Sequence, residues 1–254
     1  ERLVDLVNAL SGEKVVANPS LLLGSADMSV YSVTQLYQFL ASGGRVQPLH
    51  AVLGVLDAQG KVLSRYEVKP TKAQKGDAIA ARLVSIAMQQ TVTSGTARAL
   101  LSDGLGDLQS AGKTGTSNDS RDSWYAGFTG DHLTVVWVGN DKNEPTGLYG
   151  ATGGMRVWSN LYKRLPSRPL IVSGESLEWA YLDQSQFATT DEYCPGARRA
   201  VFVAGYLPAE AVSCGEQPDE SNSWMDWITD KFSGNKEENN NPETSDSTPS
   251  TVDQ

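Results

Sequence analysis

Four consecutive residues, Lys113, Thr114, Gly115 and Thr116, combine groups that could act together on the end of a peptide. The lysine brings a compact positive charge, and each threonine brings a hydroxyl that can donate a hydrogen bond to a carboxylate. The glycine leaves room for a ligand to approach the backbone closely, and the backbone N–H of Thr116 could stabilise an oxyanion. These residue types suit acyl transfer at a peptide carboxyl terminus.

The sequence around residues 113–116 favours a strand at the edge of a sheet. A glycine-rich stretch (95–112) precedes them, and a polar turn (117–120) and an aromatic-rich run follow. Side chains alternate along a strand, so Lys113 and Gly115 would face one way and the two threonines the other. The alternative is an exposed turn with a solvated lysine, and the neighbouring pattern favours the strand.

Apolar spacing predicts the elements that would position this strand. We expect helices over about 3–11, 32–42, 77–91 and 155–165, and β-hairpins over 52–68 and 123–138. Ser32 and Asp77 are the expected caps of the second and third helices. The run Leu133–Val138 is mostly apolar and predicts a central strand covered on both faces. Together these elements predict a mixed α/β fold of the α+β type, an antiparallel β-sheet flanked by helices.

Composition and charge exclude some classes of function. The chain has 254 residues and a net charge of −9. Residues 1–208 hold 19 acidic and 19 basic side chains, whereas 209–254 hold 11 acidic residues and two lysines. No basic stripe indicates a nucleic-acid site, and no apolar run approaches the roughly 18 residues of a membrane span. We expect the chain to be a piece of a longer protein, because Glu1 opens directly into a helical pattern.

Prolines and cysteines suggest how the chain is divided. Pro166 and Pro169 mark a boundary, so we expect one unit over 1–169, a small β-rich appendage over 170–215 and an acidic, largely disordered tail over 216–254. Cys194 and Cys214 are the only cysteines. They indicate either one disulfide in an exported protein or two free thiols in a cytosolic one.

Several motifs together resemble one family. The run 111–119, with its Lys-Thr-Gly-Thr, and the run 122–128 resemble the third active-site motif of penicillin-binding proteins and the strand after it. Further similarities to the class A (bifunctional) members, spread over about 19–165, lie at Leu23-Gly24-Ser25, Ala41-Ser42-Gly43-Gly44 with Pro48, Gly95-Thr96-Ala97 and Gly150-Ala151-Thr152-Gly153-Gly154. The similarity is strongest to the 1b type of enteric bacteria, whose C-terminal extension resembles 170–254. An exported enzyme of this kind favours a disulfide between Cys194 and Cys214.

This resemblance implies a serine-type DD-transpeptidase that cross-links peptidoglycan stem peptides and is acylated by β-lactams. It implies that Lys113 tunes the electrostatics of the catalytic serines, and that Gly115 belongs to the substrate-binding strand. Thr114 and Thr116 would bind the terminal carboxylate, and the Thr116 N–H would contribute to the oxyanion hole. It further implies the periplasmic side of the inner membrane and other cell-wall synthesis proteins as partners. We expect no cofactor, no metal and no nucleic acid.

The serine nucleophile expected of this family is not found in the chain. The family needs Ser-x-x-Lys and Ser-x-Asn upstream of Lys-Thr-Gly. Ser11-Gly12-Glu13-Lys14 has the first spacing, but Ser11 lies at a predicted helix C-terminus, where the dipole opposes an alkoxide. Ser102-Asp103-Gly104 lacks the asparagine. We therefore expect the nucleophile on preceding sequence or on another chain, and the chain alone to be inactive.

Two other functions stay open. One is a β-lactamase-type serine hydrolase that shares Lys-Thr-Gly, and the other is a non-catalytic penicillin-fold interaction module. Asp119, Arg121 and Asp122 could contact a substrate, although charged loop residues usually face water. His50 and His132 are far apart in the sequence and have no partner at metal-ligand spacing.

Overall fold

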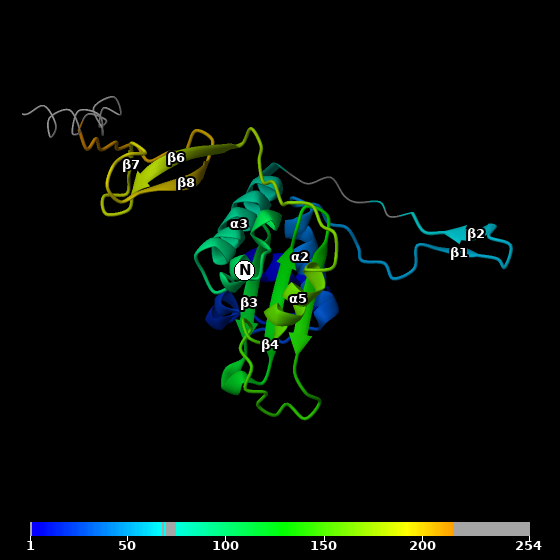
Figure 1. The fold of residues 1–254 in the computed structure, drawn as a ribbon. Coiled ribbons are helices and arrows are strands. Elements are labelled where there is room, and N and C mark those ends of the chain that lie inside the picture. Colours follow the sequence, from blue (N-terminus) through cyan, green and yellow to red (C-terminus); the bar gives the residue numbers. More distant parts are fainter. Residues whose placement is uncertain (1, 68, 70–74, 216–254) are drawn as a thin grey trace, which may run out of the picture.

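The computed structural model describes residues 2–67, 69 and 75–215 (Figure 1). The α-helices are α1 (Arg2–Ser11), α2 (Val30–Ala41), α3 (Lys75–Thr93), α4 (Ala99–Ser102) and α5 (Gly154–Tyr162). Short 3-10 helices are η1 (Pro19–Leu23), η2 (Gly106–Leu108) and η3 (Asn118–Ser120). The strands are β1 (Gly54–Leu56), β2 (Val62–Arg65), β3 (Ala111–Thr116), β4 (Ser123–Phe128), β5 (Leu133–Val138), β6 (Leu177–Asp183), β7 (Ala188–Thr190) and β8 (Ala197–Val203). None of these described helices is long and apolar enough to cross a membrane.

The central sheet consists of β3, β4 and β5, paired antiparallel in that order. β4 is the middle strand, and its Tyr125 and Phe128 are buried on opposite faces. Tyr125 packs with Trp158 of α5, whereas Phe128 packs in a cluster with Tyr37 of α2 and Met88 of α3. Helices therefore cover both faces of this sheet (Figure 1). The predicted antiparallel sheet flanked by helices is confirmed.

The predicted position of Leu133–Val138 is wrong. Among the strands of the described residues, this run forms β5 at one edge of the sheet, not in its centre, and Trp137 is 40% exposed. Its apolar character has a different reason, because α2 and α5 both pack against β5. An apolar run indicates that both faces of a strand are covered. It does not indicate the position of the strand in the sheet.

The predicted cap of α2 is also wrong. Ser29 is the N-cap, and its Oγ accepts a hydrogen bond of 3.1 Å from the N–H of Ser32. Ser32 lies one turn inside the helix, where it is buried and donates to Glu13 Oε1 at 2.7 Å. Phe39 is the most buried apolar side chain of α2. α3 likewise begins at Lys75, before the expected cap Asp77.

α5 supplies the large side chains of the main core. Met155, Trp158 and Tyr162 lie on one face at spacings of three and four residues, and all are buried. The Trp158 ring meets Tyr125 edge-on at 5.4 Å between centroids and stacks on Tyr162 at 3.8 Å. These contacts fix α5 against β4, the strand next to residues 113–116.

The first predicted hairpin is confirmed as β1 and β2, which pair around a turn at residues 57–61. Asp57 accepts the N–H groups of Gln59 and Lys61 and so fixes this turn. The residues of both strands are exposed, and the hairpin extends away from the rest of the molecule (Figure 1).

A second antiparallel sheet, in the order β7-β6-β8, follows the central unit. A disulfide joins Cys194 and Cys214 within this part of the chain, with Cα atoms 5.6 Å apart. Figure 1 shows this sheet apart from the central one, next to one end of α3. The proposed division at 169 and 215 remains a prediction, and the expected acidic tail, 216–254, lies outside the described residues.

Candidate active site

Residues 113–116 form most of β3, at one edge of the central sheet, as the sequence predicts. In the described part of the chain no strand pairs with the outer side of β3. The Lys113 side chain is exposed, and its Nζ donates to the carbonyl oxygen of Thr114 at 2.9 Å. The ammonium group is thus held beside the open edge.

Both threonine hydroxyls are held by groups from other segments. Thr114 Oγ1 lies 2.8 Å from Oγ1 of Thr96, in the turn between α3 and α4. Thr116 Oγ1 accepts a hydrogen bond of 2.9 Å from the N–H of Gly150, in the loop before α5. Strand alternation places these two hydroxyls on the face opposite to Lys113.

The outer edge of β3 presents the backbone of the two threonines. Thr91 of α3 donates its hydroxyl to the carbonyl oxygen of Gly112 at 2.5 Å, so the Gly112 carbonyl points outward. In an antiparallel strand, the N–H and C=O groups of every second residue point to the same side. The N–H groups of Thr114 and Thr116 therefore also point outward. The Thr116 N–H therefore faces the side of β3 that no described strand covers.

Glycines let the loop 150–154 lie directly against this strand. A Cβ on Gly150 would come within 2.8 Å of the Gly115 carbonyl oxygen and of Thr114 Cβ. A Cβ on Gly153 would come within 2.3 Å of Ser123 Oγ. Ser123 Oγ donates to the Tyr149 carbonyl at 2.8 Å, which ties this loop to β4. The glycines of this motif therefore serve close packing behind the threonine hydroxyls.

Gly112 allows an equally close approach to Tyr125. A Cβ at position 112 would lie 2.1 Å from the Tyr125 hydroxyl oxygen. That hydroxyl is buried and finds no hydrogen-bond partner among the described residues. Burial raises the pKa of Tyr125 well above its ordinary range. β3 thus rests on a neutral phenol that fills the space a side chain would take.

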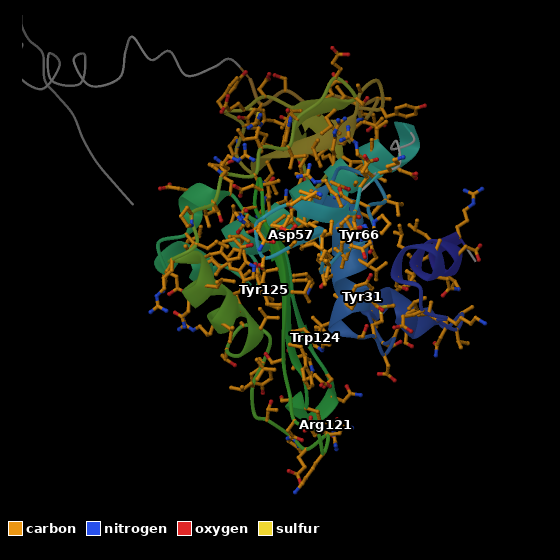
Figure 2. The ribbon with its side chains drawn as sticks, turned by 90° about the vertical axis from the view of Figure 1, so that its right-hand side faces the viewer. Tyr31, Asp57, Tyr66, Arg121, Trp124 and Tyr125 are labelled. Atoms are coloured by element: carbon orange, nitrogen blue, oxygen red, sulfur yellow. A yellow bond between two sulfur atoms is a disulfide. The ribbon has the colours of Figure 1, made fainter. Side chains whose placement is uncertain are left out.

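The three charged residues near the motif bind groups of the protein in their own loop, in β5 and in the loop after it. Arg121 donates to the carbonyl of Asn143 and pairs with Asp119 at 3.3 Å. Asp122 accepts a hydrogen bond of 2.8 Å from Trp137 Nε1. In Figure 2, Arg121 lies at the tip of the molecule, beyond Trp124 and farther from Tyr125. These contacts account for all three residues without a substrate.

The two serine motifs set aside in the sequence have structural roles. Ser11 ends α1, where its Oγ donates to the Val7 carbonyl at 2.7 Å, and Gly12 follows with a φ of 73°. Asp103 accepts from Ser159 Oγ at 2.8 Å and pairs with Lys163 of the segment after α5 at 3.1 Å. The Ser159 hydrogen bond, with the nearby lysine, lowers the pKa of Asp103. These contacts give Ser11 and Asp103 structural roles.

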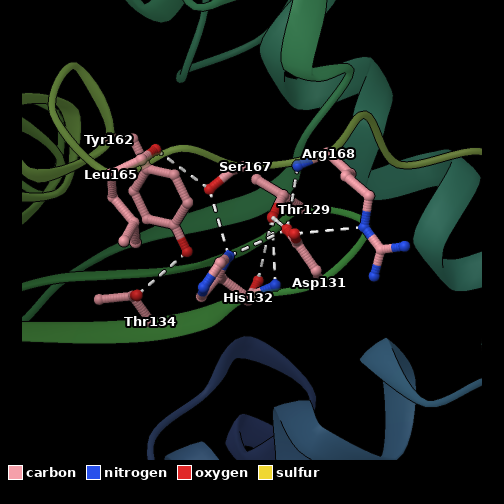
Figure 3. A network of polar contacts seen from close by, with 8 residues as sticks. All are labelled: Thr129, Asp131, His132, Thr134, Tyr162, Leu165, Ser167 and Arg168. Atoms are coloured by element: carbon pink, nitrogen blue, oxygen red, sulfur yellow. Dashed lines mark hydrogen bonds and ion pairs between the residues drawn. The ribbon is translucent and has the colours of Figure 1, made fainter.

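A second cluster combines serine, histidine and aspartate, but it is not a catalytic triad (Figure 3). Asp131 Oδ1 lies 2.9 Å from His132 Nδ1, and Ser167 Oγ lies 3.3 Å from the same nitrogen. A triad needs the aspartate and the serine on different ring nitrogens. Asp131 also accepts the N–H of Arg168 at 3.0 Å, which is the main cause of a pKa lowered to about 2. The cluster ties the β4–β5 turn to the segment after α5.

Comparison with known proteins identifies the family. The family described as the penicillin-binding protein transpeptidase domain matches residues 8–154, more than half of the chain. The chain belongs to this family. Penicillin-binding protein 1B of Vibrio cholerae serotype O1 is 42% identical over 172 residues, which cover 65% of this chain and 22% of that protein. Its counterpart in Escherichia coli K12 is 41% identical over 152 residues, 60% of this chain and 18% of that protein.

These relatives confirm the resemblance to class A penicillin-binding proteins of the 1b type, and the chain spans about a fifth of their length. A solved structure of penicillin-binding protein 1A from Haemophilus influenzae matches with a TM-score of 0.66. It is 22% identical, and the match covers 80% of this chain and 36% of that one. At this identity the likeness concerns the fold, and it agrees with the predicted penicillin-binding protein transpeptidase fold.

Thr96 and Gly150 are the residues whose contacts the sequence did not predict. Both lie in motifs on which the family resemblance rests, yet nothing in the sequence predicted that either residue would contact a threonine of β3. They are 18 and 34 residues from their threonine partners, and no spacing rule spans such distances. The signal available was a glycine in each turn, Gly95 and Gly150, which indicates close packing without naming its partner.

Proposed function

We propose that this chain supplies one wall of the active site of a peptidoglycan DD-transpeptidase. The observation that carries the proposal is the Lys113–Thr114–Gly115–Thr116 sequence on the open edge of β3, within the segment that matches the family. Its outward Thr116 N–H and exposed Lys113 side chain suit a substrate that lies along this edge. The nucleophilic serine comes from preceding sequence or another chain.

The reaction has two acyl transfers. The serine hydroxyl attacks the carbonyl of the D-Ala-D-Ala peptide bond, its proton passes through a base to the leaving nitrogen, and D-alanine departs. An amino group of a second stem peptide then attacks the acyl-serine, which forms the cross-link and regenerates the hydroxyl. A β-lactam enters the first step as a mimic of the donor peptide and remains attached to the serine.

Each residue of the wall has one role in this proposal. The N–H of Thr116 donates to the oxyanion, an interaction commonly worth about 3 kcal/mol in the transition state. The hydroxyls of Thr114 and Thr116 donate to the terminal carboxylate, and Gly115 keeps the strand accessible. Lys113 places a positive charge near the reacting serine and favours its alkoxide character.

The setting follows from the same proposal. The enzyme would act on the periplasmic side of the inner membrane, as part of a bifunctional glycosyltransferase and transpeptidase. Its ligands would be stem peptides and β-lactams, and its partners other cell-wall synthesis proteins. The disulfide between Cys194 and Cys214 supports an oxidising compartment.

Labelling with a fluorescent penicillin, read on denaturing gels, tests the proposal. The full polypeptide that contains residues 1–254 should take up the label, and Lys113→Ala should slow labelling at least tenfold. Lys142→Ala, which removes an exposed lysine from the β5–α5 loop, is the matched control and should label normally. Equal labelling of Lys113→Ala and the control would refute the role of Lys113.

The same assay separates the alternative functions. Residues 1–254 alone should not be labelled, and label on them would restore Ser11 as a candidate. Rapid loss of label by hydrolysis, with no transfer to an added amine, would favour the β-lactamase-type hydrolase. Absence of label on the full polypeptide would favour the non-catalytic module.

A further inference from the structure

We infer that Thr96 is a positioning residue for the carboxylate site, and that it sets the direction of the Thr114 hydroxyl. The inference rests on the proposed function, because it assigns to Thr114 a carboxylate ligand. Its direct support is the 2.8 Å contact between the two hydroxyl oxygens. Thr96 acts through Thr114 and does not touch the substrate.

The turn that carries Thr96 is fixed at both ends. Ala97, the next residue, is fully buried, and its N–H donates to the Thr91 carbonyl at 3.0 Å. Thr91 in turn donates its hydroxyl to the Gly112 carbonyl in β3. A Cβ on Gly95 would come within 2.8 Å of Thr91 Cα, so this turn is tightly packed. The backbone therefore holds the Thr96 hydroxyl at a constant place beside β3.

The direction of the hydrogen bonds decides whether Thr114 can bind an anion. A threonine hydroxyl has one proton and two lone pairs. If Thr114 gave its proton to Thr96, its lone pairs would face the carboxylate and repel it. If Thr96 donates to Thr114, the Thr114 proton is free for the carboxylate, and the two hydrogen bonds strengthen each other. Carboxylate binding thus favours one direction of donation, in which Thr96 donates to Thr114 and Thr114 donates to the carboxylate.

The direction of the Thr116 hydroxyl is also set by a donor, but this donor cannot reverse its role. Its Oγ1 accepts from the Gly150 N–H, a group that can only donate. The Thr116 proton is therefore available for a ligand at all times. The two threonines become donors by different means, a backbone amide behind Thr116 and a reorientable hydroxyl behind Thr114. This difference makes Thr96 the part of the site that a single substitution can test.

Acylation rates of the full polypeptide with two ligands test the inference. Benzylpenicillin has a free carboxylate, whereas in benzylpenicillin methyl ester the carboxylate is masked. Thr96→Val keeps the shape and removes the donor, and it should lower the rate constant for benzylpenicillin about fivefold, the effect of one hydrogen bond. The rate constant for the ester should stay within about twofold, because the ester carries no charge to be oriented. Thr96→Ser restores a donor and should recover most of the benzylpenicillin rate.

Two further variants complete the design. Thr93→Val removes a similar hydroxyl from the end of α3, where it donates to the Gln90 carbonyl of the same helix, and should leave both rates unchanged. In a Thr114→Val background, Thr96→Val should have no further effect, because its route to the carboxylate is gone.

The possible failures are distinguishable. A wild-type polypeptide that benzylpenicillin does not acylate would refute the proposed function. With an active wild type, an unchanged benzylpenicillin rate in Thr96→Val would refute this inference alone. An equal loss with both ligands would also refute it, since it would show that the substitution disturbs the turn and not the carboxylate.

Discussion

Gly112 sets how closely β3 can approach the layer beneath it. Alanine at this position would place its Cβ 2.1 Å from the buried Tyr125 oxygen, and the tyrosine ring is itself held by Trp158. We predict that Gly112→Ala destabilises the fold by about 1–3 kcal/mol, because the core must shift to admit the methyl group. Urea unfolding followed by tryptophan fluorescence measures this difference.

Gly106→Ala is the matched control for that substitution. Its Cβ would lie 3.3 Å from a Leu101 methyl group, the flexible end of a side chain, and Gly106 is not among the residues with positive φ. Its effect should stay below about 0.5 kcal/mol. A Gly112→Ala variant as stable as this control would show that β3 has room over Tyr125.

The residue types of the candidate site are a prediction from the sequence, whereas the contacts of its side chains could not be predicted. Lysine, glycine and two threonines on one extended segment indicated an anion clamp, and β3 presents them at an edge. The partners of the two hydroxyls, Thr96 and Gly150, come from separate turns that only the packed structure brings together. The residue pattern of one segment predicts a strand, but it does not predict which turns pack beside that strand.

At the scale of elements, apolar periodicity predicts where helices and strands lie along the chain better than it predicts the order of the strands in the sheet. The first helix, the two hairpins and the helix after Gly153 were found where apolar spacing placed them. Leu133–Val138 was misplaced because helices on both faces of an edge strand produce the same apolar run as a central position. Ser29 was missed because the serine at position 32 also lies near the helix start, and its burial against Glu13 is a tertiary contact.

The contacts of Asp131 hold the β4–β5 turn against the segment after α5, and their contribution to stability should depend on pH. The folded pKa of Asp131, about 2, lies below the value near 4 expected in the unfolded chain. Its contribution to stability is therefore complete above about pH 4 and is lost as the pH falls toward 2. We predict that Asp131→Asn lowers the melting temperature at pH 6, and that the difference from wild type disappears near pH 2.

Thermal unfolding between pH 2 and pH 7 checks this prediction. Asp141→Asn, a substitution of an exposed aspartate in the β5–α5 loop, should follow the wild-type curve throughout. A difference between Asp131→Asn and wild type that stays constant down to pH 2 would show that the carboxylate charge is not the stabilising feature.

At the scale of the molecule, the described residues form two three-stranded sheets that depend on different interactions. The central sheet is covered by helices on both faces, whereas the β6–β8 sheet has the disulfide between Cys194 and Cys214 close to it. A cross-link that closes a loop of this length stabilises by about 3 kcal/mol. We predict that reduction loosens the β6–β8 sheet and leaves the central sheet intact.

Hydrogen exchange with and without a reductant measures this separation. Amides of residues 177–203 should exchange faster after reduction, while those of β3, β4 and β5 should keep their protection. The Cys194→Ser/Cys214→Ser double variant should behave like the reduced protein. Equal loss of protection in both sheets would show that they unfold as one unit.

The claim that connects all three scales is that residues 113–116 serve a nucleophile outside this chain. The direct measurement is to acylate the full polypeptide with benzylpenicillin, digest it and identify the modified residue by mass spectrometry. We predict a penicilloyl group on a serine outside residues 1–254, with its yield strongly reduced in Lys113→Ala. A penicilloyl group on a residue within 1–254, Ser11 included, would contradict the account.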